Sequence, residues 1–378
     1  MKSIKLIAML LLTVLIGTSC IRDEELNTEA DITKCTLPVE QLSRPDIDVF
    51  SPFDLELNAY PIYLPIADGV DVTALSPEFE VTEGASIEPA SGSRQNFSRP
   101  VRYTVTSEDG MWHRTYAVVA KEQQKLPNFY HFETAKTDGK YHIIYEEMGN
   151  HTVTWGSGNG GFALAVSTAK PTEYPTFLSP DGYQGNCVKM VTRETGSLGE
   201  LVGMPIASGN LFIGRFDIGN ALSKPLEATK FGEPFTAKPI SLTGHFRYKA
   251  GPKFFEKGVE VNKKDMMHIY AIFYESTDDT PMLDGNIQEN NYEHPNMVAV
   301  AILENPHETK GDEWEEFKIT FDYARYGKTI DPDKLAAGKY HLGIVFASSV
   351  NGATFAGAPG STLMIDELKL ISEKFSFK

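Results

Sequence analysis

The stretch Val101-Arg102-Tyr103-Thr104-Val105-Thr106-Ser107-Glu108-Asp109-Gly110, continued by Thr115-Tyr116-Ala117-Val118-Val119, decides the fold of the N-terminal part of the chain. In its first half, apolar and polar residues alternate with the period of a β-strand that has one buried face. An Asp-Gly pair between two such runs is a strong hairpin signal, because glycine accepts the positive φ of a tight turn. The stretch therefore predicts an antiparallel hairpin.

The segments before this hairpin are also short and strand-like. Strands are expected at Phe53–Leu57, Tyr60–Ile66 and Glu78–Val81. Prolines at 61, 65, 77, 89 and 100 exclude long helices, because proline lacks the N–H that a helix interior needs. Short strands with frequent turn signals predict a small β-sandwich over residues 35–121.

The same two-residue period continues in the larger C-terminal part. Alternating runs lie at Phe317–Tyr323, Tyr340–Phe346 and Leu363–Leu370. Helical periodicity is nearly absent, and Pro332–Ala337 allows at most a turn or two of helix. A charged connector, Lys121–Pro127, sets the boundary. The expected fold is all-β, with a jelly roll over residues 127–378 that carries long loops.

The N-terminus has the form of an export signal. Lys2 and Lys5 precede an apolar run that ends in Gly17-Thr18-Ser19-Cys20, and this run is too short to cross a bilayer. Small residues before a cysteine resemble the lipobox of bacterial lipoproteins, although Gly17 replaces the usual leucine. The resemblance implies a signal peptide over residues 1–19 and lipidation of Cys20. An ordinary secretory signal is the alternative.

Residues 20–34 are polar and rich in acidic side chains, which predicts a flexible tether. Acidic residues directly after the cysteine also resemble the signal that sends some lipoproteins to the outer face of the outer membrane. The alternative is a merely soluble linker. With Cys20 lipidated, the protein is expected to be anchored to the outer membrane by lipid and exposed at the cell surface.

Charge and cysteine content exclude several function classes. The net charge is −16, so the chain repels phosphate backbones and no nucleic-acid partner is expected. Membrane attachment must come from the lipid, because there is no basic excess to bind an anionic surface. Cys35 and Cys187 are expected to be unpaired thiols, with a disulfide as the alternative. No Cys-x-x-Cys pair exists to form a structural zinc site.

Two sets of segments carry a family resemblance. Residues Asp71–Leu75, Gly84–Gly92 and Tyr103–Tyr116 resemble immunoglobulin-like N-terminal modules of surface lipoproteins. Residues Ser208–Phe216, Phe231–Phe235, Lys238-Pro239, Leu242–Tyr248 and Ser361–Leu368 resemble the putative carbohydrate metabolism domain of polysaccharide-degrading bacteria. The resemblance implies an immunoglobulin-like domain followed by a galactose-binding-like jelly roll. It implies a role in carbohydrate metabolism without a mechanism.

Motifs of catalysis and cofactor binding are weak. Gly156, Gly158 and Gly161 satisfy G-x-G-x-x-G, but without a βαβ context they predict a glycine loop between strands. No G-x-S-x-G or H-E-x-x-H motif occurs, and no cofactor or metal is expected. Glu133 and Asp366 sit at places in the chain that suit ligands of a structural calcium, and a surface salt bridge or turn cap is the alternative. Nothing in the sequence favours any one carboxylate pair for glycoside hydrolysis, and Glu275 with Asp322 is one example.

Aromatic residues in polar loops suggest recognition of sugars. Sugar C–H faces stack on Trp and Tyr rings, while sugar hydroxyls need polar partners. The candidate carbohydrate-binding residues are Trp155, Asn159, Tyr183, Arg247 and Tyr292. For the three aromatics the alternative is packing under long loops. Trp314 is expected in the core, and Trp112 is expected to cover the N-terminal sandwich.

These observations lead to one expected function and two alternatives. The expected function is that of a surface-anchored lipoprotein that binds glycan or polysaccharide through its C-terminal jelly roll, without catalysis. One alternative is a glycoside hydrolase or lyase with an unrecognised carboxylate site. The other is a structural or adhesive module that binds a partner protein.

Overall fold

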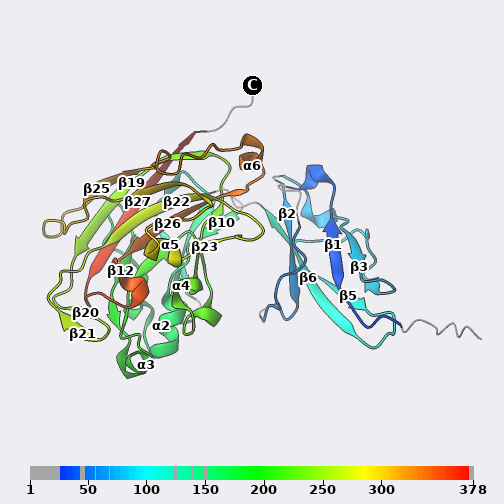
Figure 1. Ribbon diagram of the computed structural model, residues 1–378, viewed down its shortest axis with the longest axis horizontal. Coiled ribbons are helices and arrows are strands. Elements are labelled where there is room, and N and C mark those ends of the chain that lie inside the picture. The colour runs from blue at the N-terminus through cyan, green and yellow to red at the C-terminus, as the bar shows by residue number, and fades with distance from the viewer. Residues whose placement is uncertain are drawn as a thin grey trace, which may run out of the picture. The chain divides into compact units, whose positions relative to one another are not determined.

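The computed structural model describes residues 26–42, 47–55, 57–67, 69–122, 126–137, 139–148 and 151–373. The chain divides into two compact units, residues 1–122 and 123–378, and in each the regular structure is mostly β-strand (Figure 1). The all-β expectation is therefore confirmed. The predicted signal peptide and Cys20 lie outside the described residues.

The N-terminal unit contains a four-stranded sheet and a strand pair. The sheet has the order β2-β6-β5-β4, and β1 pairs with β3. The bounds are β1 (Ile32–Thr36), β2 (Tyr60–Ile66), β3 (Glu78–Val81), β4 (Ser86–Glu88), β5 (Val101–Thr106) and β6 (His113–Glu122). The hairpin β5–β6 is confirmed, and Gly110 in its turn has φ +71°. β2 tolerates Pro61 and Pro65 because it is the edge strand of this sheet.

Three expectations for the N-terminal unit need correction. The part of the predicted tether that the structure describes is folded, because Ile32 is 1% exposed in β1 and its N–H donates to the Tyr116 hydroxyl. The acidic composition of this segment concealed the apolar residues that enter the core. Of the predicted strand Phe53–Leu57, the structure describes every residue but 56. None of these described residues lies in a strand, and only Asp54 makes an isolated bridge, to Ala59. Trp112 is 63% exposed and does not cover the core.

The C-terminal unit is built around two antiparallel sheets. The first has the order β11-β12-β27-β19-β25, with β7 beside β27, and the second has the order β15-β26-β22-β24, with β18 beside β26. The first sheet comprises β7 (Phe129–Tyr130), β11 (Thr176–Ser179), β12 (Cys187–Val191), β19 (Lys238–Lys249), β25 (Glu315–Thr320) and β27 (Thr362–Glu373). The second comprises β15 (Asn210–Phe212), β18 (Glu233–Pro234), β22 (His268–Glu275), β24 (Met297–Ile302) and β26 (Tyr340–Ala347).

The inner faces of the two sheets share one hydrophobic core. Leu242 and Phe246 of β19 belong to the same buried cluster as Ile269 of β22 and Ile344 of β26. Burial of large apolar side chains on both inner faces drives this packing. The C-terminal unit is therefore a β-sandwich, and the three strand predictions made from its alternating runs are confirmed by β25, β26 and β27.

The outer face of the second sheet is covered as well. In β26 every residue but the last is buried, although its sequence alternates. A second apolar cluster, which includes Phe231, Tyr270, Ile287 and Val345, lies on this outer face. The covering elements are α2 (Asn159–Ala165), α3 (Gly196–Leu201), α4 (Pro225–Ala228), α5 (Asn286–Glu289), β16 (Gly214–Phe216), β17 (Thr229–Phe231) and β23 (Leu283–Asp284).

The remaining elements are peripheral to the sandwich. They are β8 (Thr134–Thr137), β9 (His142–Met148), β10 (His151–Thr154), β13 (Arg193–Glu194), β14 (Ile206–Ala207), β20 (Phe254–Glu256), β21 (Val259–Val261) and α6 (Pro332–Ala336). The short helix α6 agrees with the turn or two expected there. The prediction of a glycine loop between strands is wrong, because the helix α2 begins directly after Gly158.

Both of the remaining cysteines are buried free thiols, Cys35 in the N-terminal unit and Cys187 in the C-terminal unit. Burial raises the pKa of each thiol to about 12, so both remain protonated at neutral pH. Across the described residues, none of the helices combines the length and the apolar character that crossing a membrane requires.

Candidate functional site

A polar groove of about 630 Å³ runs over the outer face of the first sheet of the sandwich. Strands β12, β27 and β19 form its floor, and two loops form its walls. The residues that line it are Asp181, Gly182, Lys189, Arg247, Tyr248, Lys249, Gly311, Asp312, Trp314, Thr362 and Met364. We call this the polar groove. Its size lies in the range that small ligands occupy on proteins.

Three rings form an aromatic cluster at the edge of the polar groove. Tyr183 stacks on His245 with 3.7 Å between ring centroids and 9° between ring planes. It meets Trp314 in an edge-to-face arrangement, with 6.4 Å between ring centroids and 74° between ring planes. Tyr183 is 54% exposed, so the ring face opposite His245 is open to solvent. Such a fixed, exposed ring is the surface on which a sugar C–H face can stack.

Cationic side chains stand on the floor of the groove. The Arg247 guanidinium lies 5.2 Å above the Trp314 ring and donates to the Asp312 carbonyl oxygen at 3.0 Å. Lys189 of β12 and Arg247 of β19 both face Met364 of β27 in the strand register. Because strands lie roughly 4.8 Å apart, these two cations stand on either side of β27. Lys189 has no ion pair with another described residue.

Two carboxylates hold the loop that carries Tyr183. Asp366 is fully buried, and its Oδ2 accepts a hydrogen bond from the Gln184 N–H at 2.9 Å. Glu133 accepts from the Asn186 N–H at 3.0 Å. Gly185 has φ +69°, and a Cβ there would lie 2.1 Å from the Glu133 carboxylate, so the turn requires glycine. The loop is thus fixed before any ligand arrives.

The environment of Asp366 changes its ionisation. Burial raises the pKa of this carboxyl to about 6, while hydrogen bonds from backbone N–H groups act in the opposite direction. Glu133 and Asp366 both accept hydrogen bonds from backbone N–H groups of the loop, so their contacts are those of turn caps. Among the described residues, no group of three His, Cys, Asp or Glu side chains is arranged to hold a metal ion.

The other three candidate residues lie in the interior, which corrects the expectation that they contact sugar. Trp155 is 3% exposed and packs against Tyr130 and Phe132 between the sheets. Asn159 is fully buried, and its amide exchanges two hydrogen bonds with the backbone of Thr176. Tyr292 is 5% exposed, with its hydroxyl 2.9 Å from His268 Nε2. Local loop composition could not reveal that these residues are covered by distant segments.

The structure also identifies residues that sequence reasoning missed. Trp314, expected in the core, is half-buried on the wall of the polar groove. His245 and Lys189 are further residues of this kind, and each occupies an outward position of an alternating strand. Strand alternation could have identified these outward positions, but it could not show which strands would be neighbours.

The carboxylate pair named for hydrolysis does not line the polar groove. Glu275 forms an ion pair with Lys334 at 2.5 Å, and Asp322 accepts a hydrogen bond from the Arg325 N–H. Asp181 and Asp312 are the carboxylates that line the groove. Asp312 is fully exposed on its loop, and Asp181 accepts from the Ser179 hydroxyl at 3.3 Å.

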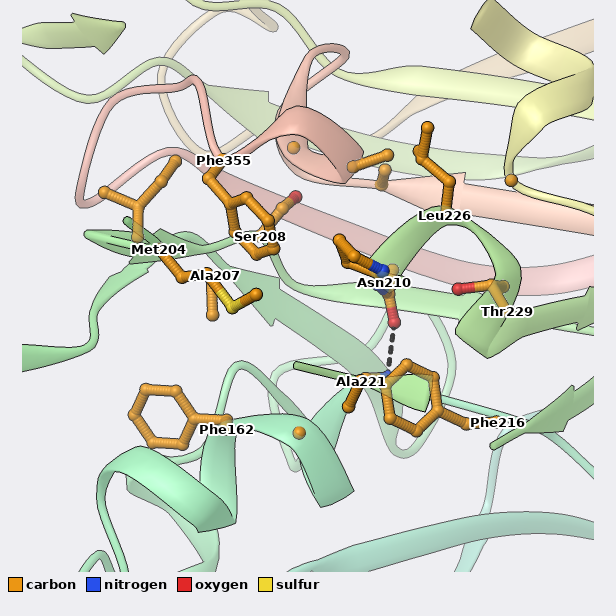
Figure 2. Close-up of a pocket in the computed structure, with 18 of the residues that line it drawn as sticks. Phe162, Met204, Ala207, Ser208, Asn210, Phe216, Ala221, Leu226, Thr229 and Phe355 are labelled. Atoms are coloured by element: carbon orange, nitrogen blue, oxygen red, sulfur yellow. Dashed lines mark hydrogen bonds between the residues drawn. The ribbon is translucent and has the colours of Figure 1, made fainter. Parts of the chain in front are cut away.

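A second, different pocket lies on the covered side of the molecule (Figure 2). It has a volume of about 230 Å³, and its walls come from α2, α3, α4, β15 and β17. Gly158 and Gly161 allow this close packing, since a Cβ at 161 would lie 3.2 Å from the Phe216 ring. We call this the apolar pocket. The two sites share none of their lining residues.

Models of two known families match the chain, one in each of its two units. The family model described as "Putative carbohydrate metabolism domain" matches residues 131–371, and the model of the N-terminal domain of surface glycan-binding proteins matches residues 57–119. No curated protein matches the chain at a significant level.

Two solved structures are similar over long stretches. A Bacteroides thetaiotaomicron protein described as a putative glycoside hydrolase is 44% identical, with a TM-score of 0.71, and the match covers 94% of this chain and 100% of that one. A Bacteroides vulgatus protein of the same description is 53% identical, with a TM-score of 0.64, and the match covers 66% of this chain and 100% of that one. The family match spans well over half of the chain. This protein therefore belongs to the putative carbohydrate metabolism domain family.

Proposed function

We propose that the protein binds glycan or polysaccharide at a cell surface through the polar groove. The observation that carries this proposal is the stack of Tyr183 on His245 beside Trp314, with Arg247 held over the Trp314 ring. The rings offer flat faces to sugar C–H groups, and Arg247, Lys189 and Asp181 offer donors and acceptors to hydroxyls. Tyr183 and Arg247 are the candidate residues retained from the sequence.

The hydrogen bonds around the Tyr183 loop support a binding site that is already formed before the ligand arrives. The loop of Tyr183 is tied to Glu133 and Asp366, so its ring loses little freedom when a ligand stacks on it. Less ordering on binding leaves more of the contact energy as affinity. An open groove with few anchors favours recognition of a chain of sugars over enclosure of one small molecule.

The proposed folds of the two units and the proposed lipid anchor are those expected from the sequence. We propose an immunoglobulin-like fold for the N-terminal unit and a jelly roll for the C-terminal sandwich. The signal peptide at residues 1–19 and lipidation of Cys20 remain part of the proposal. In this proposal the lipid holds the protein at the outer membrane, and the N-terminal unit lies between the anchor and the glycan-binding unit in the order of the chain. The name of the N-terminal family supports this location.

The test is a glycan array probed with the full chain, followed by calorimetry on each hit. Binding to at least one plant, host or microbial polysaccharide, weakened about tenfold in Tyr183→Ala, is the expected result. Absence of binding to every polysaccharide at millimolar sugar concentration would exclude the proposal. The same mixtures are analysed by mass spectrometry for shorter products, because turnover abolished by one Asp or Glu substitution would establish the hydrolase alternative instead.

A further inference from the structure

The lining of the apolar pocket differs in chemistry from that of the polar groove. None of the described residues that line it is Asp, Glu, Lys, Arg or His, whereas the groove contains side chains of both charge signs. Charged residues make up 23% of the whole chain. A charged ligand would lose its hydration here without gaining an ionic partner, so the pocket selects against charge.

The volume of the apolar pocket limits the size of its ligand. An apolar cavity of roughly 150 Å³ holds one benzene molecule. At about 230 Å³, this pocket accommodates a single ring with a substituent of a few atoms. Phe162, Phe216 and Phe355 line the pocket, and Figure 2 shows their rings around it. Rings pack on one another in offset or edge-to-face geometry, so these walls favour an aromatic ligand.

Two polar groups in the pocket have unused hydrogen-bonding capacity. The Asn210 Oδ1 accepts from the Gly158 N–H at 2.7 Å, as drawn in Figure 2, whereas its Nδ2 donates to no other described residue. The Thr229 hydroxyl, which also lines the pocket, has no hydrogen bond to the described part of the chain. A ligand with an oxygen acceptor would pair with the Asn210 amide.

A sugar fits this pocket poorly. Each buried sugar hydroxyl without a partner costs free energy, and the apolar pocket offers few free polar atoms for a whole ring of hydroxyls. Its rim is apolar as well, with Leu198 51% exposed and Leu222 55% exposed. The pocket is therefore suited to a ligand different from the one proposed for the polar groove.

We infer that the apolar pocket binds a neutral, single-ring aromatic molecule that carries an oxygen acceptor, such as an aryl ester. The ring lies among the three phenylalanine side chains, and the acceptor oxygen receives the Asn210 Nδ2 hydrogen bond. This site is additional to the polar groove and does not depend on glycan binding.

The test is calorimetric titration of the full chain with methyl 4-hydroxybenzoate. Saturable binding with one site per chain is expected, and benzoate, which is charged, should bind at least tenfold more weakly. Ala353 lines the pocket and is exposed, so Ala353→Phe should fill part of the space without unfolding the chain and weaken binding at least tenfold. Thr229→Val keeps the shape of the side chain and should weaken binding by a smaller factor.

Matched controls separate this inference from the proposed function. Ala324 is exposed in the same unit and does not line the pocket, so Ala324→Phe should bind the ester like the wild type. Tyr183→Ala should also leave ester binding unchanged, because Tyr183 lies outside the pocket. No saturation up to the solubility limit of the ester would overturn the inference, as would equal affinity in Ala353→Phe. Tighter binding of methyl octanoate than of the aryl ester would overturn the aromatic assignment.

Discussion

The outer faces of the two sheets in the C-terminal sandwich differ, because one is open to solvent and the other is covered. The first sheet leaves Lys189 and Arg247 facing an open polar groove, while the second sheet is covered by short helices and strands. The inner faces are alike, since both contribute to one apolar core. Which side chains of this sandwich can reach a ligand therefore depends on what covers the outer side of each sheet. An aromatic residue is available to a glycan only where that cover is missing.

The largest expected effect is on stability, and it distinguishes the tryptophan between the sheets from the tryptophan on the groove wall. Trp155→Ala removes a ring buried between the sheets and should lower the free energy of unfolding by about 3–5 kcal/mol. Trp314→Ala removes a half-buried ring and should cost about 1 kcal/mol in stability. Urea denaturation followed by circular dichroism measures both. Equal losses of stability would contradict the assignment of one tryptophan to the core and the other to the groove.

The pH dependence of stability tests the role of Asp366, the buried carboxyl that holds the Tyr183 loop beside the polar groove. The folded pKa of Asp366, about 6, is above the roughly 3.9 of an unfolded aspartate. The folded state therefore holds this proton more tightly, and the associated stability is present at low pH and lost as the pH rises through 6. Wild type should gain on the order of 2 kcal/mol relative to Asp366→Asn between pH 7 and pH 4.

The measurement is urea denaturation of both proteins at each pH. Subtracting the unfolding free energy of Asp366→Asn from that of wild type at each pH cancels the contributions of all the other carboxylates, which both proteins share. If the difference in unfolding free energy between the two proteins stayed constant from pH 4 to pH 7, Asp366 would not titrate in this range. That result would contradict a carboxyl whose pKa is raised by burial under the Tyr183 loop.

Loss of the exposed ring in the groove should have a moderate effect on binding. Tyr183→Ala should weaken glycan affinity about tenfold while the unfolding free energy changes by less than about 1 kcal/mol, because one face of this ring is in solvent. Trp112, 63% exposed in the N-terminal unit, provides the matched control. If Trp112→Ala reduced affinity as much as Tyr183→Ala, glycan recognition would not be confined to the C-terminal unit.

The smallest expected effect concerns the shape of a cation. Arg247→Lys keeps the positive charge but loses the planar guanidinium that lies over Trp314. Glycan affinity should fall by about two- to fivefold in Arg247→Lys. In Arg247→Met it should fall further, because the charge is lost as well. Calorimetry with the same polysaccharide distinguishes them. Identical affinity in all three proteins would exclude Arg247 from the site.

The sequence predicted strands better than it predicted exposure. Local alternation was enough for the hairpin β5–β6 and for β25, β26 and β27, because a strand's period is set by its own residues. It was not enough for Trp155, Tyr292 and Trp314, because burial depends on segments far away in the chain. In β26 the alternating pattern suggested an open face that the covering elements bury. The short helix α2 was missed because its glycines weaken the helical signal.

The most direct test of glycan recognition by the open face is a paired titration. The best polysaccharide from the array is titrated into wild type, Trp314→Ala and Ala353→Phe, with the fold of each checked by circular dichroism. Binding should be strongly reduced in Trp314→Ala and unchanged in Ala353→Phe, since only the first alters the polar groove. Wild-type affinity in Trp314→Ala together with lost binding in Ala353→Phe would place glycan recognition in the apolar pocket and contradict the assignment of the two faces.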